Sequence, residues 1–176
     1  MKNLGLLATL IVCLTGCGRL YTTKAFNETE RVVLQCSKNY EKNYGCSILG
    51  WGGPFGSKVT NMMVDYEMPC VDMDVNTARR IAVDGIDNLL RGVNTDMDIR
   101  KYMEKHPFTI DDIYYSMDFL KECSKGEYLE VGNVSLILGE KLVYVFWDQE
   151  KECLKKVHEE TYDQASKILQ KEMLCE

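Results

Sequence analysis

The sequence contains few of the residues and patterns by which enzymes and nucleic-acid-binding proteins are usually recognised. Its 176 residues include only three prolines and two histidines, with no block of like charge and no repeat, which argues against a disordered or fibrous chain. The net charge of −6 and the pI near 5.1 provide no basic surface for nucleic acid or for an acidic membrane. Because 45% of the residues are apolar, we expect an ordinary folded domain without a nucleic-acid partner.

Motifs for catalysis, metal binding and cofactor binding are also missing. No serine lies in G-x-S-x-G or S-x-x-K, and His158 opens H-E-E-T-Y without the second histidine of a zinc protease. The acidic run that begins at Asp72 resembles a calcium-binding loop, but Thr77 replaces the required glycine. We therefore predict a protein that is not an enzyme and has no metal or cofactor. One alternative is a cell-envelope enzyme that uses His106.

The N-terminus has the layout of a secretory signal peptide. Lys2 precedes an apolar run at residues 4–14 (LGLLATLIVCL), and Arg19 follows it. A membrane-spanning helix needs about 20 apolar residues, so this run is too short to be one. The pattern predicts a signal peptide at residues 1–16 that is removed after export.

The last residues of this signal form the tetrapeptide Leu14-Thr15-Gly16-Cys17, which resembles the lipobox of bacterial lipoproteins. The resemblance implies that a diacylglycerol is attached to the thiol of Cys17 and that cleavage falls between Gly16 and Cys17. Two or three acyl chains, such as palmitate, hold a domain stably at a bilayer. Gly18 is not the aspartate that retains lipoproteins in the inner membrane, so the resemblance implies the outer membrane.

Six cysteines remain in the mature chain once Cys13 and Cys17 are set aside. An even number of cysteines in an exported domain is typical of disulfide bonds, although the sequence does not choose among the pairings. The wide spacing, without any C-x-x-C, argues against zinc, redox and haem motifs. We predict at least one disulfide, the alternative being reduced and partly buried thiols. The candidate residues are Cys36, Cys46, Cys70, Cys123, Cys153 and Cys175.

The rest of the chain predicts a single α+β domain at residues 31–176, preceded by a lipidated N-terminus and tether at residues 17–30. Apolar residues recur at three- and four-residue steps within 75–92, which predicts a helix capped by Asp74. The expected order is a strand at 31–37, a glycine-rich loop at 45–56, helices at 75–92 and from Asp96 to Lys105, strands at 113–119, 129–138 and 142–147 with a two-residue turn at Gly139-Glu140, and a helix at 157–172. This order predicts an antiparallel β-meander packed against two or three helices, with the last helix on the sheet.

Two aromatic residues of the glycine-rich loop, Trp51 and Phe55, are the candidates for contact with a partner. Exposed aromatic side chains are typical of protein interfaces, and an apolar patch around these two would mark the subunit of an envelope complex. The alternative, which we favour, is that both side chains fold back and cap the core.

Several short segments share one further resemblance. The segments are residues 78–80 (ARR), 98–102 (DIRKY), 106–109 (HPFT) and 158–162 (HEETY). They are similar to a motif of small uncharacterised exported proteins and lipoproteins of chlamydia-like intracellular bacteria. The resemblance covers residues 70–165 and implies no known activity. From the residues themselves we expect Pro107, Phe108 and Thr109 to form a structural corner, with the proline ending a helix and the phenylalanine in the core.

These features predict a lipid-anchored protein of the bacterial cell envelope, periplasmic or exposed at the surface. We expect it to act as a binding or structural module for an unidentified ligand. The expected partners are the membrane, through the N-terminal lipid, and an envelope protein.

Overall fold

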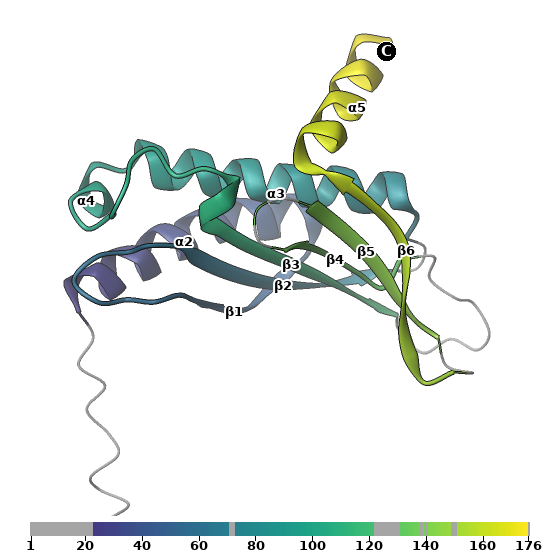
Figure 1. Cartoon of the computed structure of the whole chain (residues 1–176), viewed down its shortest axis with the longest axis horizontal. Coiled ribbons are helices and arrows are strands. Elements are labelled where there is room, and N and C mark those ends of the chain that lie inside the picture. The colour runs from purple at the N-terminus through teal and green to yellow at the C-terminus, as the bar shows by residue number, and fades with distance from the viewer. Residues whose placement is uncertain are drawn as a thin grey trace, which may run out of the picture.

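The sheet has six strands whose order in space is their order in the chain (Figure 1). The computed structural model describes residues 23–70, 73–121, 131–137, 139, 141–148 and 151–175. The strands are β1 (Ser47–Gly52), β2 (Met62–Cys70), β3 (Ile113–Lys121), β4 (Asn133–Ile137), β5 (Lys141–Asp148) and β6 (Cys153–Thr161). The helices are α2 (Lys24–Tyr44), α3 (Val75–Thr95), α4 (Met97–Arg100), the 3-10 helix η1 (Ile110–Asp112) and α5 (Tyr162–Cys175). The predicted α+β class is confirmed.

Only one neighbouring pair of strands is parallel. β2 and β3 run in the same direction, because α3 and α4 carry the chain back between them, as a parallel connection requires. The pairs β3–β4 and β4–β5 are antiparallel, which confirms the predicted meander. Ile137 pairs with Lys141, so three residues separate β4 from β5 and the two-residue turn is wrong. Gly139 in that turn has a φ of 71°, which favours glycine.

The first helix replaces two predicted features, the tether up to residue 30 and the strand at residues 31–37. Both predictions are wrong over residues 24–37, because α2 begins at Lys24 with Thr23 as its N-cap. The buried residues of α2 recur at helical steps from residue 25 to residue 40, and only four of them fall within 31–37: Ala25, Thr29, Val32, Val33, Cys36, Ser37 and Tyr40. The helix ends at Gly45, whose φ of 67° is the left-handed conformation typical of a C-cap.

Other corrections concern the strands that lie at or near the edges of the sheet. The predicted loop at residues 45–56 contains β1, and the acidic, methionine-rich segment after residue 61 contains β2. The predicted helix at residues 157–172 is wrong at its start, because residues up to Thr161 belong to β6. The helix expected up to Lys105 ends at Arg100, although Asp96 does cap it.

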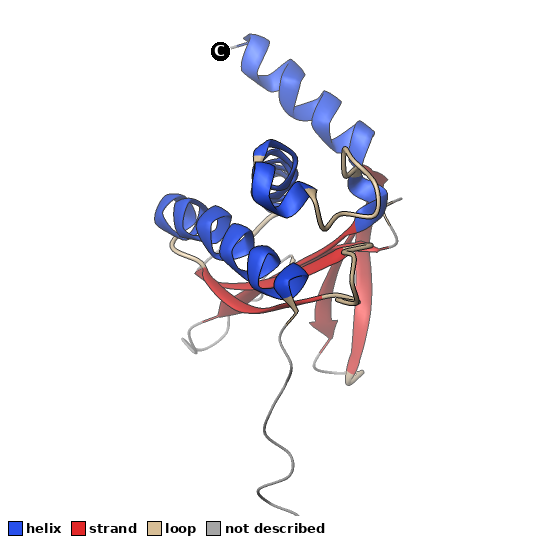
Figure 2. Ribbon diagram, turned by 90° about the vertical axis from the view of Figure 1, so that its left-hand side faces the viewer, coloured by secondary structure: helices blue, strands red, loops and turns tan. Residues whose placement is uncertain are grey.

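Two long helices cover one face of the sheet, whereas α5 projects away from it (Figures 1 and 2). The predicted helix at 75–92 is confirmed as α3, and the Asp74 carboxylate accepts a hydrogen bond of 2.6 Å from the backbone N–H of Thr77. The main contacts of α5 are with α3 and with β6, the strand that precedes it, so the expectation that it lies on the sheet is wrong (Figure 1). Ala165 is the α5 residue that joins the buried core.

Candidate functional site

A buried polar cluster joins α3 to the end of β6, next to the start of α5. The Nε of Arg79 donates a 2.7 Å hydrogen bond to Oε1 of Glu160, and these side chains are only 6% and 5% exposed. The hydroxyl of Tyr144, on β5, donates a 2.6 Å hydrogen bond to the same Oε1 atom. A buried ion pair is tolerated only when its charges are paired and hydrogen-bonded, as they are here. The cluster therefore holds the corner between β6 and α5 against α3.

His158 lies at the edge of this cluster. Its ring packs against that of Tyr144 at a centroid distance of 5.4 Å, and its Nε2 lies 3.6 Å from Oε2 of Glu160. That distance is too long for a hydrogen bond, and the buried Nε2 atom has no other partner in the described residues. His158 lies in β6 and not in the helix predicted for residues 157–172.

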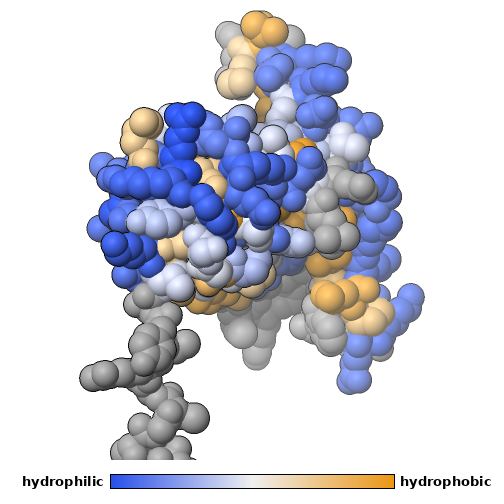
Figure 3. Space-filling view, turned by 60° about the vertical axis from the view of Figure 1, so that its left-hand side comes forward, coloured by the Kyte–Doolittle hydropathy of each residue, from blue (hydrophilic) through white to orange (hydrophobic). Residues whose placement is uncertain are grey.

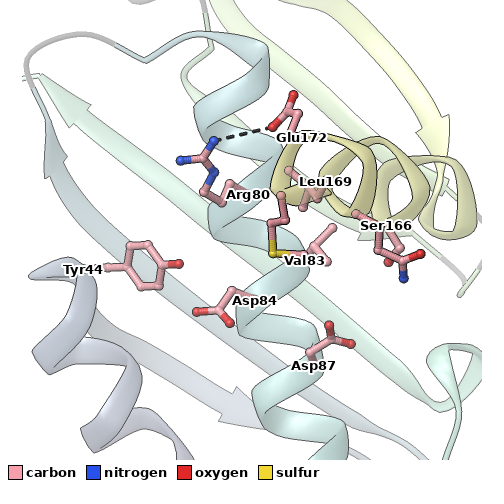
Figure 4. Close-up of a pocket in the computed structure, with 10 residues that line it drawn as sticks. Tyr44, Arg80, Val83, Asp84, Asp87, Ser166, Leu169 and Glu172 are labelled. Atoms are coloured by element: carbon pink, nitrogen blue, oxygen red, sulfur yellow. Dashed lines mark hydrogen bonds and ion pairs between the residues drawn. The ribbon is translucent and has the colours of Figure 1, made fainter. Parts of the chain in front are cut away.

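Beyond this corner, α3 and α5 diverge and leave a cleft of about 390 Å³ (Figure 4). The C-terminal end of α2 closes one side of the cleft with the ring of Tyr44. The other residues that line it come from α3 and α5: Arg80, Val83, Asp84, Asp87, Ser166, Leu169, Gln170, Glu172 and Met173. Ligand pockets of proteins commonly have a volume of about 300–1,000 Å³ with a mostly apolar lining and a few polar groups.

Tyrosine hydroxyls face both carboxylates of the α3 wall. Burial, followed by the neighbouring Asp84 carboxylate, raises the pKa of Tyr44 to about 12, so its phenol stays protonated at neutral pH. Tyr162 donates a short hydrogen bond to Oδ1 of Asp87, and its pKa is raised, mainly by burial. At the mouth of the cleft the guanidinium of Arg80 lies 3.5 Å from Glu172 (Figure 4).

The predicted aromatic contacts, Trp51 and Phe55, lie together rather than standing free. Their ring centroids are 5.5 Å apart, and both rings contact Phe26 of α2, at 4.8 and 5.5 Å. Both side chains are partly buried and pack against the core. This supports the interpretation that we favoured, in which the two rings cap the core.

The candidate disulfides are only partly described. Cys36, Cys46 and Cys153 are free thiols in the structure. The side chains of Cys70, Cys123 and Cys175 lie outside the described residues, as do Gly16, Cys17 and the whole predicted signal peptide. Burial raises the pKa of Cys36, and it raises the pKa of Cys46 to about 11. Neither thiol has the thiolate character of a nucleophile.

The histidine of the enzyme hypothesis lies on the surface. His106 is exposed, and its Nε2 is 3.1 Å from the backbone carbonyl of Asn94. The neighbouring corner has Phe108 in the core as predicted, only 2% exposed, and Thr109 in a capping box with Asp112. The prediction that Pro107 ends a helix is wrong, because α4 ends at Arg100. The described residues include no group of three or more metal-ligating side chains that could hold a metal ion.

No protein-family model, curated protein or solved structure matches the chain. Among the described residues, no helix has both the length and the hydropathy that a membrane span requires.

Sequence reasoning missed the cleft entirely. Two of its acidic residues, Asp84 and Asp87, lie within the predicted helix at 75–92, away from the apolar positions of its periodicity. They are three positions apart on one helix and could have been paired from the spacing alone. Nothing in the sequence, however, places α5 opposite them.

Proposed function

We propose that the chain is a lipid-anchored binding module of the bacterial cell envelope, with the α3–α5 cleft as its binding site. The observation that carries this proposal is the lipobox-like tetrapeptide at residues 14–17, directly after the apolar run. A cavity of suitable size in the described domain supports a binding role rather than a purely structural one.

The position of α2 adds a geometric argument for this role. Lys24, the first helical residue, is seven positions after Cys17, and an extended chain of that length spans at most about 25 Å. A lipid on Cys17 would therefore hold the N-terminal end of α2 close to the bilayer. Tyr44 lies at the other end of this 21-residue helix, which is about 30 Å long, and lines the cleft. The cleft therefore lies about one helix length away from the end of α2 that the lipid would tether.

The anchor is tested by the intact mass of native protein that has been extracted in detergent and alkylated without reduction. We expect the mass of residues 17–176 plus a diacyl or triacyl lipid. The number of alkyl groups would then count the free thiols among the six remaining cysteines. A Cys17→Ala variant serves as the control, and we expect it to lose the lipid and its association with the membrane fraction. A native mass without lipid, or recovery of the native protein in the cytosolic fraction, would contradict the proposal.

A further inference from the structure

We infer that the α3–α5 cleft binds a small organic cation, an ammonium group attached to an apolar chain. The inference names the ligand class of the binding module and rests on the function proposed above. Three features of the cleft carry it: two carboxylates without a counter-cation, an apolar strip beside them, and an arginine that is already paired.

Asp84 and Asp87 are three positions apart on α3 and line the cleft, with the Asp84 carboxylate pointing toward Tyr44 and the Asp87 carboxylate pointing away from it (Figure 4). Neither forms an ion pair with a lysine, arginine or histidine in the part of the chain that the structure describes. A carboxylate offers about four acceptor positions, and a single tyrosine hydroxyl occupies one of them. Each carboxylate therefore keeps acceptor positions that an ammonium group, which donates three hydrogen bonds, would fill.

Apolar side chains from both walls line the cleft together with the two carboxylates. Val83 on α3 faces Leu169 and Met173 on α5, and Met173 is 69% exposed. In Figure 3 the tip of α5 is apolar and stands clear of a largely hydrophilic surface. Covering such exposed apolar side chains with the chain of a ligand stabilises the complex by the hydrophobic effect.

The charges of the cleft argue against the other small ligands. Its lining contains three carboxylates and one guanidinium, and Arg80 already lies 3.5 Å from Glu172. An anion would therefore meet two unpaired carboxylates and a cation that is engaged elsewhere. A bare metal ion is also disfavoured, because the described residues contain no group of three metal-ligating side chains.

The test uses three probes that share a six-carbon chain and differ in charge: hexylammonium, hexan-1-ol and hexanoate. The purified protein is held in nanodiscs of phosphatidylcholine, and each probe is titrated calorimetrically with empty nanodiscs as the reference. We expect hexylammonium to bind at least about tenfold more tightly than the alcohol, and hexanoate not to bind. A tenfold difference corresponds to about 1.4 kcal/mol.

Substitution of the two carboxylates provides the residue-level test. We expect Asp84→Asn and Asp87→Asn each to weaken hexylammonium binding by about tenfold. Asp163→Asn is the matched control, because it removes the same charge from an exposed residue of α5 that does not line the cleft. We expect this control to bind hexylammonium as the parent protein does.

A second pair of variants keeps the inference testable if the asparagine variants unfold. Ser166 lines the cleft from α5, and Ser166→Lys would place an ammonium group of the chain itself opposite Asp84 and Asp87. We expect Ser166→Lys to abolish binding of hexylammonium and Ser166→Gln, its neutral match, to retain it.

Two results would overturn the inference: equal binding of all three probes, or equal effects of Asp163→Asn and Asp84→Asn. These results are distinct from a failure of the anchor. A lipidated protein that does not distinguish hexylammonium from hexan-1-ol would refute the ligand class alone. A protein without lipid that still binds hexylammonium through Asp84 and Asp87 would support the ligand class while refuting the envelope anchor.

Discussion

Helix α3 packs closely on its α2 side and openly on its α5 side. On the close side, Gly85 lets the rings of Tyr40 and Tyr115 approach the helix, where a Cβ would lie only 2.7 Å from Tyr115. Two turns later, Gly92 lets the Sγ of Cys36 approach α3, where a Cβ at residue 92 would clash with that atom. On the open side, the helix meets α5 across a cleft of about 390 Å³.

The two sides of α3 have different consequences for the molecule. Close-packed surfaces cannot accept added atoms without strain, so the buried contacts of α3 with Tyr40 and Cys36 of α2 contribute to stability. A surface groove of about 450 Å³ lies beside them, between α2 and α3. On the α5 side Ala165 is buried in the core and Tyr162 and Leu169 are only partly buried against it, and regions with few buried contacts open at a low free-energy cost. One helix thus has tight contacts at Gly85 and an open cleft where it meets α5.

The largest expected effect comes from the buried ion pair that links the two parts. Arg79→Leu leaves the carboxylate of Glu160 buried without its counter-cation, so we expect a loss of about 3–5 kcal/mol in the free energy of unfolding, measured by urea denaturation. Arg80→Leu is the matched control at the next position. Its ion pair at 3.5 Å is exposed, so we expect a loss below about 1 kcal/mol. Similar losses for the two variants would show that the buried Arg79–Glu160 ion pair contributes no more to stability than the exposed Arg80–Glu172 pair.

The next largest effect tests the close packing on the α2 side. Gly85→Ala places a Cβ within 2.9 Å of both Tyr40 and Tyr115, whose hydroxyls are hydrogen-bonded at 2.7 Å and cannot withdraw freely. We expect a net loss of about 1–3 kcal/mol, measured by thermal denaturation, despite the better helix propensity of alanine.

The control for this variant is the same substitution in the same helix at a site where the obstacle can be removed. In a Cys36→Ala background, a Cβ at Gly92 would meet only the Cβ of residue 36, at 3.9 Å. There we expect Gly92→Ala to be neutral or to stabilise the protein by up to about 1 kcal/mol. If Gly92→Ala in this background lost as much stability as Gly85→Ala, a cause other than the clash of the added Cβ would be responsible.

A smaller effect concerns the cap of α3, which serves both sides equally. We expect Asp74→Ala to cost about 1 kcal/mol at neutral pH, and Asp74→Asn to cost less because asparagine also caps helices. The hydrogen bond from the backbone N–H of Thr77 lowers the pKa of Asp74 in the folded chain from its ordinary value of 3.8. The carboxylate therefore stabilises the fold above about pH 4. This contribution is lost as the pH falls through the lowered folded pKa.

Melting temperatures measured between pH 7 and pH 2 give the comparison. The parent protein should lose part of its advantage over Asp74→Asn below about pH 4, because only the parent has a carboxylate to protonate at this site. An unchanged difference between the two proteins across this range would contradict the assigned cap.

The smallest expected effect is on the open side. Tyr162→Phe removes the hydrogen bond to Asp87, and because this contact is exposed we expect a loss below about 1 kcal/mol in global stability. Hydrogen exchange should become faster in α5 and remain unchanged in α2. Tyr114→Phe, on the sheet face away from the helices, is the control. Slower exchange in α5, or equal changes in both helices, would contradict the expectation that α5 opens without opening α2.

The helices and strands that bury one face along their whole length could be predicted from the sequence. The residues of α3 repeat at helical intervals because one side of the helix is core, and Asp74 marks its start by a local hydrogen bond. The alternation in β3 reflects a sheet with one covered face. In both cases the pattern lies within one continuous segment.

The missed elements lack such a local pattern. Residues 153–157 of β6 are all exposed, because β6 is an edge strand, so no apolar alternation marks it. The polar residues at 24–30 suggest a tether, although the side chains of Ala25 and Thr29 are buried and belong to the first turns of α2. Neither segment contains a local signal strong enough to outweigh its polar composition.

The sequence by itself determined α3, the meander of β3, β4 and β5, and the lipobox-like tetrapeptide on which the proposed anchor depends. Only the tertiary structure decided that Arg79 meets Glu160, 81 positions later, and that α5 faces Asp84 and Asp87 across a cleft. The physical reason is that helical and strand periodicity arise from neighbours within one segment. A site formed between remote segments depends instead on how the chain closes over the whole sheet, which no single segment encodes.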